Sequence, residues 1–276
     1  MIKNDLQQLV LEGKSKGLRN VIIKNILKEY IQYLVLSLIY NQKNMKNLIF
    51  KGGSCLRICY DIPRLSEDLD FDYNPATVGN NPLIELNRYL IKEIKEKYYP
   101  DLEIKIQGST GLYLKFPFLK DLRLADGSES NKLYVKVETT NRLSSFANFE
   151  MTPVSKYGFN FIINHYDLPT LMSGKIEALL FRIWYKEGKT EKIDIKGRDF
   201  YDLFWFLQKG IEPNWRKLKK SAGIKNFADL KKLLLKRVAK VVTPQKLSYD
   251  LSNFINDEQF VNDFSKNYLS LIKKYL

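Results

Sequence analysis

The sequence contains only two cysteines, Cys55 and Cys59, and one histidine, His165. So few cysteines exclude a disulfide framework, and the reducing cytoplasm is the simplest compartment. The cysteines are four residues apart on a predicted helix and share a face. No histidine or further cysteine accompanies them in the sequence, and a zinc site needs about four ligands, so we interpret them as core residues. The single histidine does not indicate histidine-based catalysis.

Long hydrophobic runs are also missing. The longest, such as residues 33–40, fall far short of the roughly 18 residues of a membrane span. The amino terminus has no apolar segment followed by a small-residue cleavage site, so we expect no secretion signal. Hydrophobic residues nevertheless make up 45% of the 276 residues, which predicts a folded protein of one large domain or two modest ones.

Negative charge is scarce, and the excess positive charge is uneven. The formal net charge is +14, with +5 in residues 1–165 and +9 in residues 166–276. Residues 215–246 contain 11 basic residues and one acid, Asp229. This density of positive charge favours a surface that binds nucleic acid. The alternative is a solvated surface of lysine-rich helices.

Hydrophobic periodicity divides the chain into two parts. Helical spacing covers residues 18–39, 54–60 and 83–98, and alternation typical of strands covers residues 69–73, 102–107, 112–116 and 132–140, with a weaker signal at 157–163. From residue 173 onward helical periods dominate. We therefore predict an α+β lobe over residues 1–165 and a basic helical lobe over residues 166–276.

Asp68 and Asp70 are the most informative acids. On a strand, residues two apart point to the same face, so both carboxylates would project together while Leu69 and Phe71 point into a core. Two like charges this close repel, and a divalent cation relieves the repulsion. Carboxylate oxygens suit Mg²⁺. Asp72 extends this face as a possible further ligand, although a charge at the strand end is the simpler interpretation.

A glycine turn, Gly52-Gly53-Ser54, comes before this strand and is followed by a short predicted helix that Ser54 could cap. Such a turn lets backbone N–H groups approach an anion at the positive end of a helix. It has neither the P-loop spacing nor the dinucleotide-binding spacing. Glu138, on the strand-like segment 132–140, could supply a third acid on a neighbouring strand. Its alternative is a surface glutamate paired with a lysine.

Residues 50–73 resemble the nucleotidyltransferase superfamily that includes DNA polymerase β, and within it the AbiEii/AbiGii toxin family. The family has the block K-G-G-[ST]-x-L…R-x-S-x-D-L-D-F, a later K-x-x-A-L-x-x-R helix and an R-D-x-x-D-L element. The first block is matched by Lys51, Gly52, Gly53, Ser54, Leu56, Arg64, Ser66, Asp68, Leu69, Asp70 and Phe71. The later elements are matched by Lys175, Ala178, Leu179 and Arg182, then by Arg198, Asp199, Asp202 and Leu203.

The resemblance implies a polymerase-β-like nucleotidyltransferase lobe with a mixed sheet, followed by an α-helical lobe. It implies that Asp68, Asp70 and Glu138 hold Mg²⁺ and act in catalysis with Lys175. Nucleotide-binding roles are implied for Gly52, Gly53, Ser54, Arg64, Ser66, Lys175, Arg182 and Asp202. For Arg64 and Ser66, a structural role in the loop is an equal alternative. For Arg182, the alternative is pairing with Asp199 or Asp202. For those two acids, it is capping a helix or bridging the two lobes.

Three functions follow. The first is transfer of a nucleotide from an NTP to RNA, with the tRNA acceptor end as the implied target and a cognate antitoxin as a possible partner. This would be the toxin of a toxin–antitoxin or abortive-infection system. The second is transfer to a small molecule or a protein, which the basic lobe disfavours. The third is a non-catalytic nucleic-acid-binding module, which would have no reason to keep Asp68, Asp70 and Glu138 all acidic.

Overall fold

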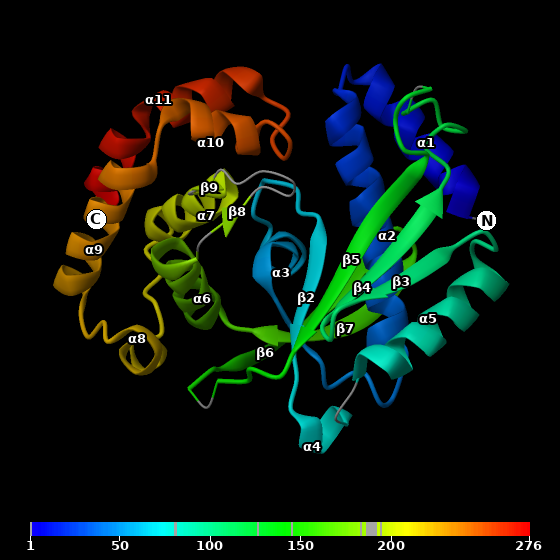
Figure 1. The fold of residues 1–276 in the computed structure, drawn as a ribbon, viewed down its shortest axis with the longest axis horizontal. Helices are drawn as coiled ribbons and strands as arrows, with labels where there is room; N and C mark the ends of the chain where they lie inside the picture. Colours follow the sequence, from blue (N-terminus) through cyan, green and yellow to red (C-terminus); the bar gives the residue numbers. More distant parts are fainter. Residues whose placement is uncertain are drawn as a thin grey trace. The chain divides into compact units, whose positions relative to one another are not determined.

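The computed structural model describes residues 2–79, 82–125, 127–144, 146–182, 184–185, 192–193 and 195–276. They form two compact units (Figure 1). Unit 1 comprises Met1–Leu143 and Phe149–His165, and unit 2 comprises Ser144–Asn148 and Tyr166–Leu276. None of the described helices is long and apolar enough to cross a bilayer.

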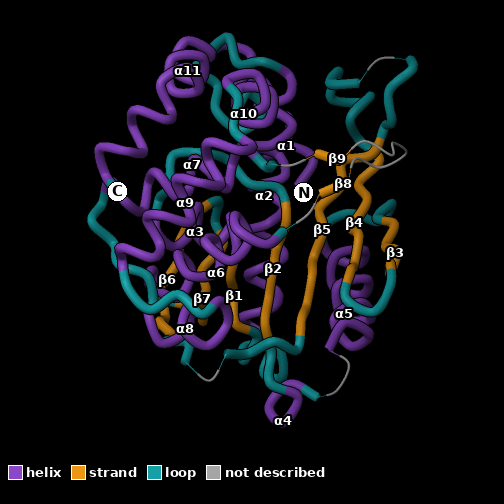
Figure 2. Tube along the Cα trace, turned by 60° about the vertical axis from the view of Figure 1, so that its left-hand side comes forward, coloured by secondary structure: helices purple, strands orange, loops and turns teal. Residues whose placement is uncertain are grey.

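Unit 1 is built on a seven-stranded mixed sheet in the order β3-β4-β5-β2-β1-β7-β6, which can be followed from edge to edge in Figure 2. Strand β2 is parallel to β5 and antiparallel to β1, which is parallel to β7. The strands are β1 (Ile49–Lys51), β2 (Asp68–Asp72), β3 (Glu103–Gln107), β4 (Gly111–Pro117), β5 (Lys132–Thr140), β6 (Phe149–Lys156) and β7 (Phe159–Tyr166). The helices are α1 (Ile2–Ser15), α2 (Asn20–Asn41), α3 (Gly52–Tyr60), α4 (Pro75–Val78) and α5 (Pro82–Lys97).

The core of unit 1 lies between the sheet and helix α2, which packs against β5 and α5 (Figure 1). Leu69 and Phe71 of β2 are fully buried on this side, and the Phe71 ring lies 6.5 Å from the Tyr40 ring of α2. Alternate residues of a strand point to opposite faces, so the even-numbered acids of β2 face away from α2. The predicted orientation of Leu69 and Phe71 is thus confirmed.

Unit 2 is helical apart from a two-stranded ribbon, β8 (Trp184–Tyr185) and β9 (Lys192–Ile193). Its helices are α6 (Leu168–Phe181), α7 (Gly197–Gln208), α8 (Trp215–Ala222), α9 (Phe227–Val241), α10 (Pro244–Leu251) and α11 (Glu258–Tyr275). Aromatic rings of α7 and α11 interlock in the core, where the Tyr268 hydroxyl donates to the Phe200 carbonyl at 3.0 Å. The aromatic run of α7 therefore belongs largely to the core of unit 2.

The mixed sheet and the helical second part confirm the predicted fold class. Strand β6 had no predicted counterpart, because most of its residues are exposed and Pro153 interrupts its pattern. The ribbon β8–β9 was also missed. The short length of its strands leaves no alternation to detect.

Candidate active site

Three acids lie on one face of two neighbouring strands, and we call Asp68, Asp70 and Glu138 the carboxylate face. Strands β2 and β5 run parallel in a register that pairs Asp70 with Glu138 and Asp68 with Lys136. All three acids are half-buried. Within the described chain, the three carboxylates do not gather within 4.8 Å of one another.

The glycine turn lies directly against this face. In the β1–β2 pairing Lys51 is opposite Asp70, and Gly52 follows with a φ of 80°. A Cβ atom at Gly52 would overlap the Asp70 carboxylate oxygen Oδ2. Only glycine combines this backbone conformation with so close an approach. The turn therefore brings main-chain atoms next to the acid.

Arg64 and Ser66 lie under the second glycine. A Cβ atom at Gly53 would be 2.8 Å from both Arg64 Nη2 and Ser66 Oγ. The Arg64 side chain is 1% exposed, and its Nη1 donates to the Leu65 carbonyl at 2.9 Å. Gln32 of α2 holds the Ser66 carbonyl at 3.1 Å. These contacts make both residues supports of the turn, while their contact with phosphate stays a prediction.

Ser54 is fully buried, and its hydroxyl donates to the Asp68 carbonyl. Helix α3 starts at Gly52, and its N-cap, Lys51, makes no side-chain capping bond. The prediction that Ser54 caps this helix is therefore wrong. The side chain instead ties the first turn of α3 to β2, so any anion at the helix end meets backbone N–H groups.

Asp72, at the end of the face, is neutralised. Lys51 Nζ lies 2.5 Å from Asp72 Oδ1 and 2.9 Å from the Thr140 hydroxyl, which also donates to Asp72. The Asp72 side chain is only 7% exposed. Buried charges are stable when paired in this way. The structure favours an ion-paired strand end over an extra metal ligand.

Lys136 was not among the predicted site residues, but it is the lysine partner that the alternative interpretation of Glu138 anticipated. Its Nζ lies 2.7 Å from Glu138 Oε1 and 5.6 Å from the centre of the Tyr113 ring. Burial alone would lower the pKa of Lys136, but the Glu138 carboxylate, with Tyr113 and Asp68, raises it. The shared face of Lys136 and Glu138 was visible as a two-residue spacing. That Lys136 is the lysine that pairs with Glu138 follows only from the side-chain geometry.

In unit 2, Lys175 of α6 joins two acids of α7, a group that we call the lysine cluster. Its Nζ lies 2.7 Å from Asp199 Oδ1 and 2.7 Å from Asp202 Oδ2. Arg182 Nη1 lies 3.9 Å from Asp199 Oδ2, the kind of pairing expected from the sequence. Burial would raise the pKa of Asp199, but Lys175 and Arg182 lower it to about 2.

A small pocket in unit 2 adjoins this cluster. Three cationic side chains line it, Arg182, Lys196 and Arg237, together with Asp199. The apolar part of its wall comes from α6, α7 and Ile195. Arg237 Nε donates to the Leu179 carbonyl at 3.0 Å, which holds that side chain against α6. Sequence reasoning missed Lys196 and Arg237 because neither belongs to a recognised motif.

The basic segment of unit 2 lies on the surface. Most of its cations are exposed: Arg216, Lys219, Lys220, Lys225, Lys231, Lys232, Lys236, Lys240 and Lys246. Lys217 differs, since it pairs with Glu177 at 2.7 Å. Helices α8 and α9 bury Leu218, Leu230 and Leu234 on their other sides. The segment can therefore present a field of positive charge to a polyanion.

Comparison with known proteins gives the family. Residues 35–276 match the family model for the nucleotidyl transferase AbiEii toxin, type IV toxin–antitoxin system. A search of the curated proteins finds no match. A candidate nucleotidyltransferase from H. pylori is 18% identical, with a TM-score of 0.45, over 90% of this chain and 94% of that one. The protein JHP933 from Helicobacter pylori is 17% identical, with a TM-score of 0.42, over 91% and 94%. Because the family model spans most of its length, this chain belongs to the AbiEii nucleotidyltransferase toxin family.

Proposed function

We propose that this nucleotidyltransferase toxin transfers a nucleotide from an NTP to RNA in a Mg²⁺-dependent reaction, with the acceptor end of tRNA as its target. The observation that carries the proposal is the carboxylate face, with Asp70 in contact with the Gly52 turn. An acidic face and an anion-binding turn are the two complementary parts that a metal-bound triphosphate requires.

The donor set fits Mg²⁺, because Asp68, Asp70 and Glu138 offer only hard oxygen ligands on adjacent strands. Asp68 and Asp70 would hold the ion, and Glu138 would complete the set. When bound, the ion would neutralise charge on the phosphates. The Gly52–Gly53 turn would orient the triphosphate with its backbone N–H groups. The roles of Lys175 and Arg182 toward the nucleotide stay predictions from the family resemblance, because both side chains lie against acids of unit 2.

In the reaction, a hydroxyl oxygen of the RNA end attacks the α-phosphorus. The new oxygen–phosphorus bond forms as the bond to pyrophosphate breaks, and the hydroxyl proton passes to a base. Glu138, which lies opposite Asp70 on the neighbouring strand, would serve either as the third metal ligand or as this base. The exposed basic residues of α8 and α9 would hold the phosphate backbone of the RNA.

The test is incubation of the purified chain with Mg²⁺, each labelled NTP in turn, and total tRNA. We expect label on tRNA with the wild type and none with Asp68→Ala. Glu103→Gln, an exposed acid on the edge strand β3, is the matched control and should behave as the wild type. Equal results for the wild type and Asp68→Ala would contradict the proposal.

The two alternatives have their own readouts. Label on an added aminoglycoside or on protein, with none on RNA, would assign the small-molecule or protein acceptor. Titration calorimetry with Mg²⁺-NTP separates the non-catalytic module, which would bind RNA but show no metal-dependent nucleotide binding. Co-expression with the product of a neighbouring gene tests for the antitoxin that a type IV system implies.

A further inference from the structure

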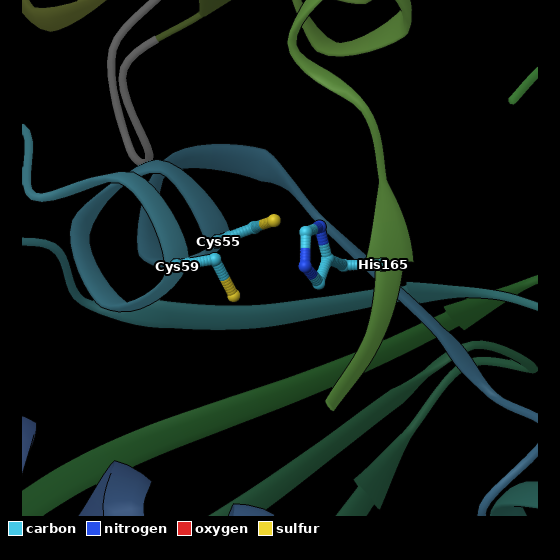
Figure 3. A group of neighbouring side chains, drawn as sticks. All are labelled: Cys55, Cys59 and His165. Atoms are coloured by element: carbon cyan, nitrogen blue, oxygen red, sulfur yellow. The ribbon is translucent and has the colours of Figure 1, made fainter. Parts of the chain in front are cut away.

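A second group of potential metal ligands lies in unit 1, away from the carboxylates. Cys55 and Cys59 of α3 and His165 of β7 offer two sulfur atoms and a ring nitrogen, all within 4.8 Å of one another (Figure 3). The expectation that no histidine accompanies the two cysteines is therefore wrong. The fold brings His165 to them because β7 lies beside β1, where Phe50 is paired with His165.

The separation is close to what a zinc ion requires. Zinc binds thiolate sulfur at about 2.3 Å and imidazole nitrogen at about 2.0–2.1 Å in a tetrahedron, so its ligand atoms lie roughly 3.5–3.8 Å apart. Since these atoms all lie within 4.8 Å of one another, no pair would have to approach by more than about 1.3 Å. Cysteines four apart on a helix share a face, and rotation about their χ1 angles suffices for this.

The histidine is already oriented. One ring nitrogen, Nε2, lies 2.8 Å from the Thr152 hydroxyl, and the other, Nδ1, lies 3.3 Å from the Tyr60 hydroxyl. Tyr60 in turn donates to Glu150 at 2.7 Å. A metal would replace one hydroxyl and leave the other to fix the ring, which is how most metal-binding histidines are held.

We propose that Cys55, Cys59 and His165 bind one zinc ion, with water in the fourth position. Cys55 and His165 are fully buried and Cys59 is half-buried, so the ion and its water would enter beside Cys59. Two thiolates and an imidazole suit zinc and exclude Mg²⁺, so this site is chemically distinct from the carboxylate face.

The site would also have a mechanical effect. Helix α3 starts at the glycine turn, and the ion would fasten its second half to β7.

Cobalt spectroscopy of the full chain tests the proposal. Co²⁺ is added to reduced, metal-free protein, and absorbance is recorded. We expect one equivalent to give the thiolate-to-cobalt charge-transfer band and the visible bands of tetrahedral cobalt. Zinc should abolish both and raise the melting temperature by a few degrees. Because the chain has no other cysteine, a thiolate band can come only from Cys55 and Cys59.

Three variants make the result specific. Cys59→Ser and His165→Asn should each weaken cobalt binding at least tenfold, while Asp70→Asn should leave the thiolate band unchanged. Circular dichroism and melting in chelator check that the variants fold. Absence of a thiolate band in folded wild-type protein with excess cobalt would overturn the proposal. An unchanged affinity in His165→Asn would overturn it as well. Neither outcome depends on nucleotidyl transfer.

Discussion

The carboxylate face of unit 1 and the lysine cluster of unit 2 use the same residue types in opposite ways. In the lysine cluster, Lys175 and Arg182 balance Asp199 and Asp202, and Asp202 is fully buried. On the carboxylate face, three half-buried acids share β2 and β5 with Lys136. A balanced buried group stabilises a fold, whereas an acidic excess close to solvent is suited to an incoming cation.

Breaking the balanced cluster should give the largest effect. Lys175→Met leaves Asp199 and Asp202 buried beside an apolar side chain, and we expect it to lower the free energy of unfolding by about 3–5 kcal/mol. Urea unfolding measures this. Lys217→Met, which breaks the more exposed pair with Glu177, is the control and should cost much less. Equal losses of unfolding free energy in the two variants would show that Lys175 stabilises unit 2 no more than Lys217 does.

Removing a charge from the carboxylate face should act on catalysis instead. Asp70→Asn keeps the shape of the side chain but removes a ligand charge. We expect a loss of about 100-fold in nucleotidyl transfer, which corresponds to about 2.7 kcal/mol of transition-state stabilisation. The melting temperature should stay the same or rise, since repulsion with Asp68 and Glu138 is relieved. A variant that loses stability rather than rate would contradict this contrast between the two regions.

The pH dependence of stability should distinguish the same regions. The pKa of Asp199 is lowered from 3.8 to about 2, so its ionised form stabilises the folded state. That contribution, about 2 kcal/mol, is complete above pH 3.8 and disappears as pH falls toward 2. Unfolding of wild type and Asp199→Asn between pH 5 and pH 2 measures it. The two curves should converge at the acid end, and parallel curves would assign the acid sensitivity elsewhere.

Local patterns predicted the elements that position the acids. Alternation over residues 132–140 gave β5 with its observed bounds, and the spacing of Asp68 and Asp70 gave their common face. Such features depend on neighbours in the sequence. The exposed strand β6 left no comparable pattern, because its side chains do not alternate between core and solvent.

Contacts between residues far apart in the chain could not be predicted from the sequence. The burial of Arg64 under Gly53 depends on how a loop folds back, and the proximity of His165 to Cys55 depends on the order of strands in the sheet. The family resemblance supplied the identity of the acids, but not the lysine that would compete with the metal. Lys136 became a site residue only when its side chain was seen against Glu138.

Lys136→Met should give the smallest effect. The side chains of Lys136 and Glu138 are 26% and 35% exposed, so breaking their pair should change the free energy of unfolding by less than about 1 kcal/mol. The same change removes a positive charge that competes with Mg²⁺ for Glu138, and we expect the half-saturating Mg²⁺ concentration to fall a few-fold. Lys132→Met, which breaks the comparable Lys132–Glu103 pair on β5 and β3, should leave it unchanged. A rise in the half-saturating Mg²⁺ concentration for Lys136→Met would instead make Lys136 a contact of the NTP phosphates. This measurement therefore decides whether Lys136 competes with Mg²⁺ for Glu138 or binds the nucleotide.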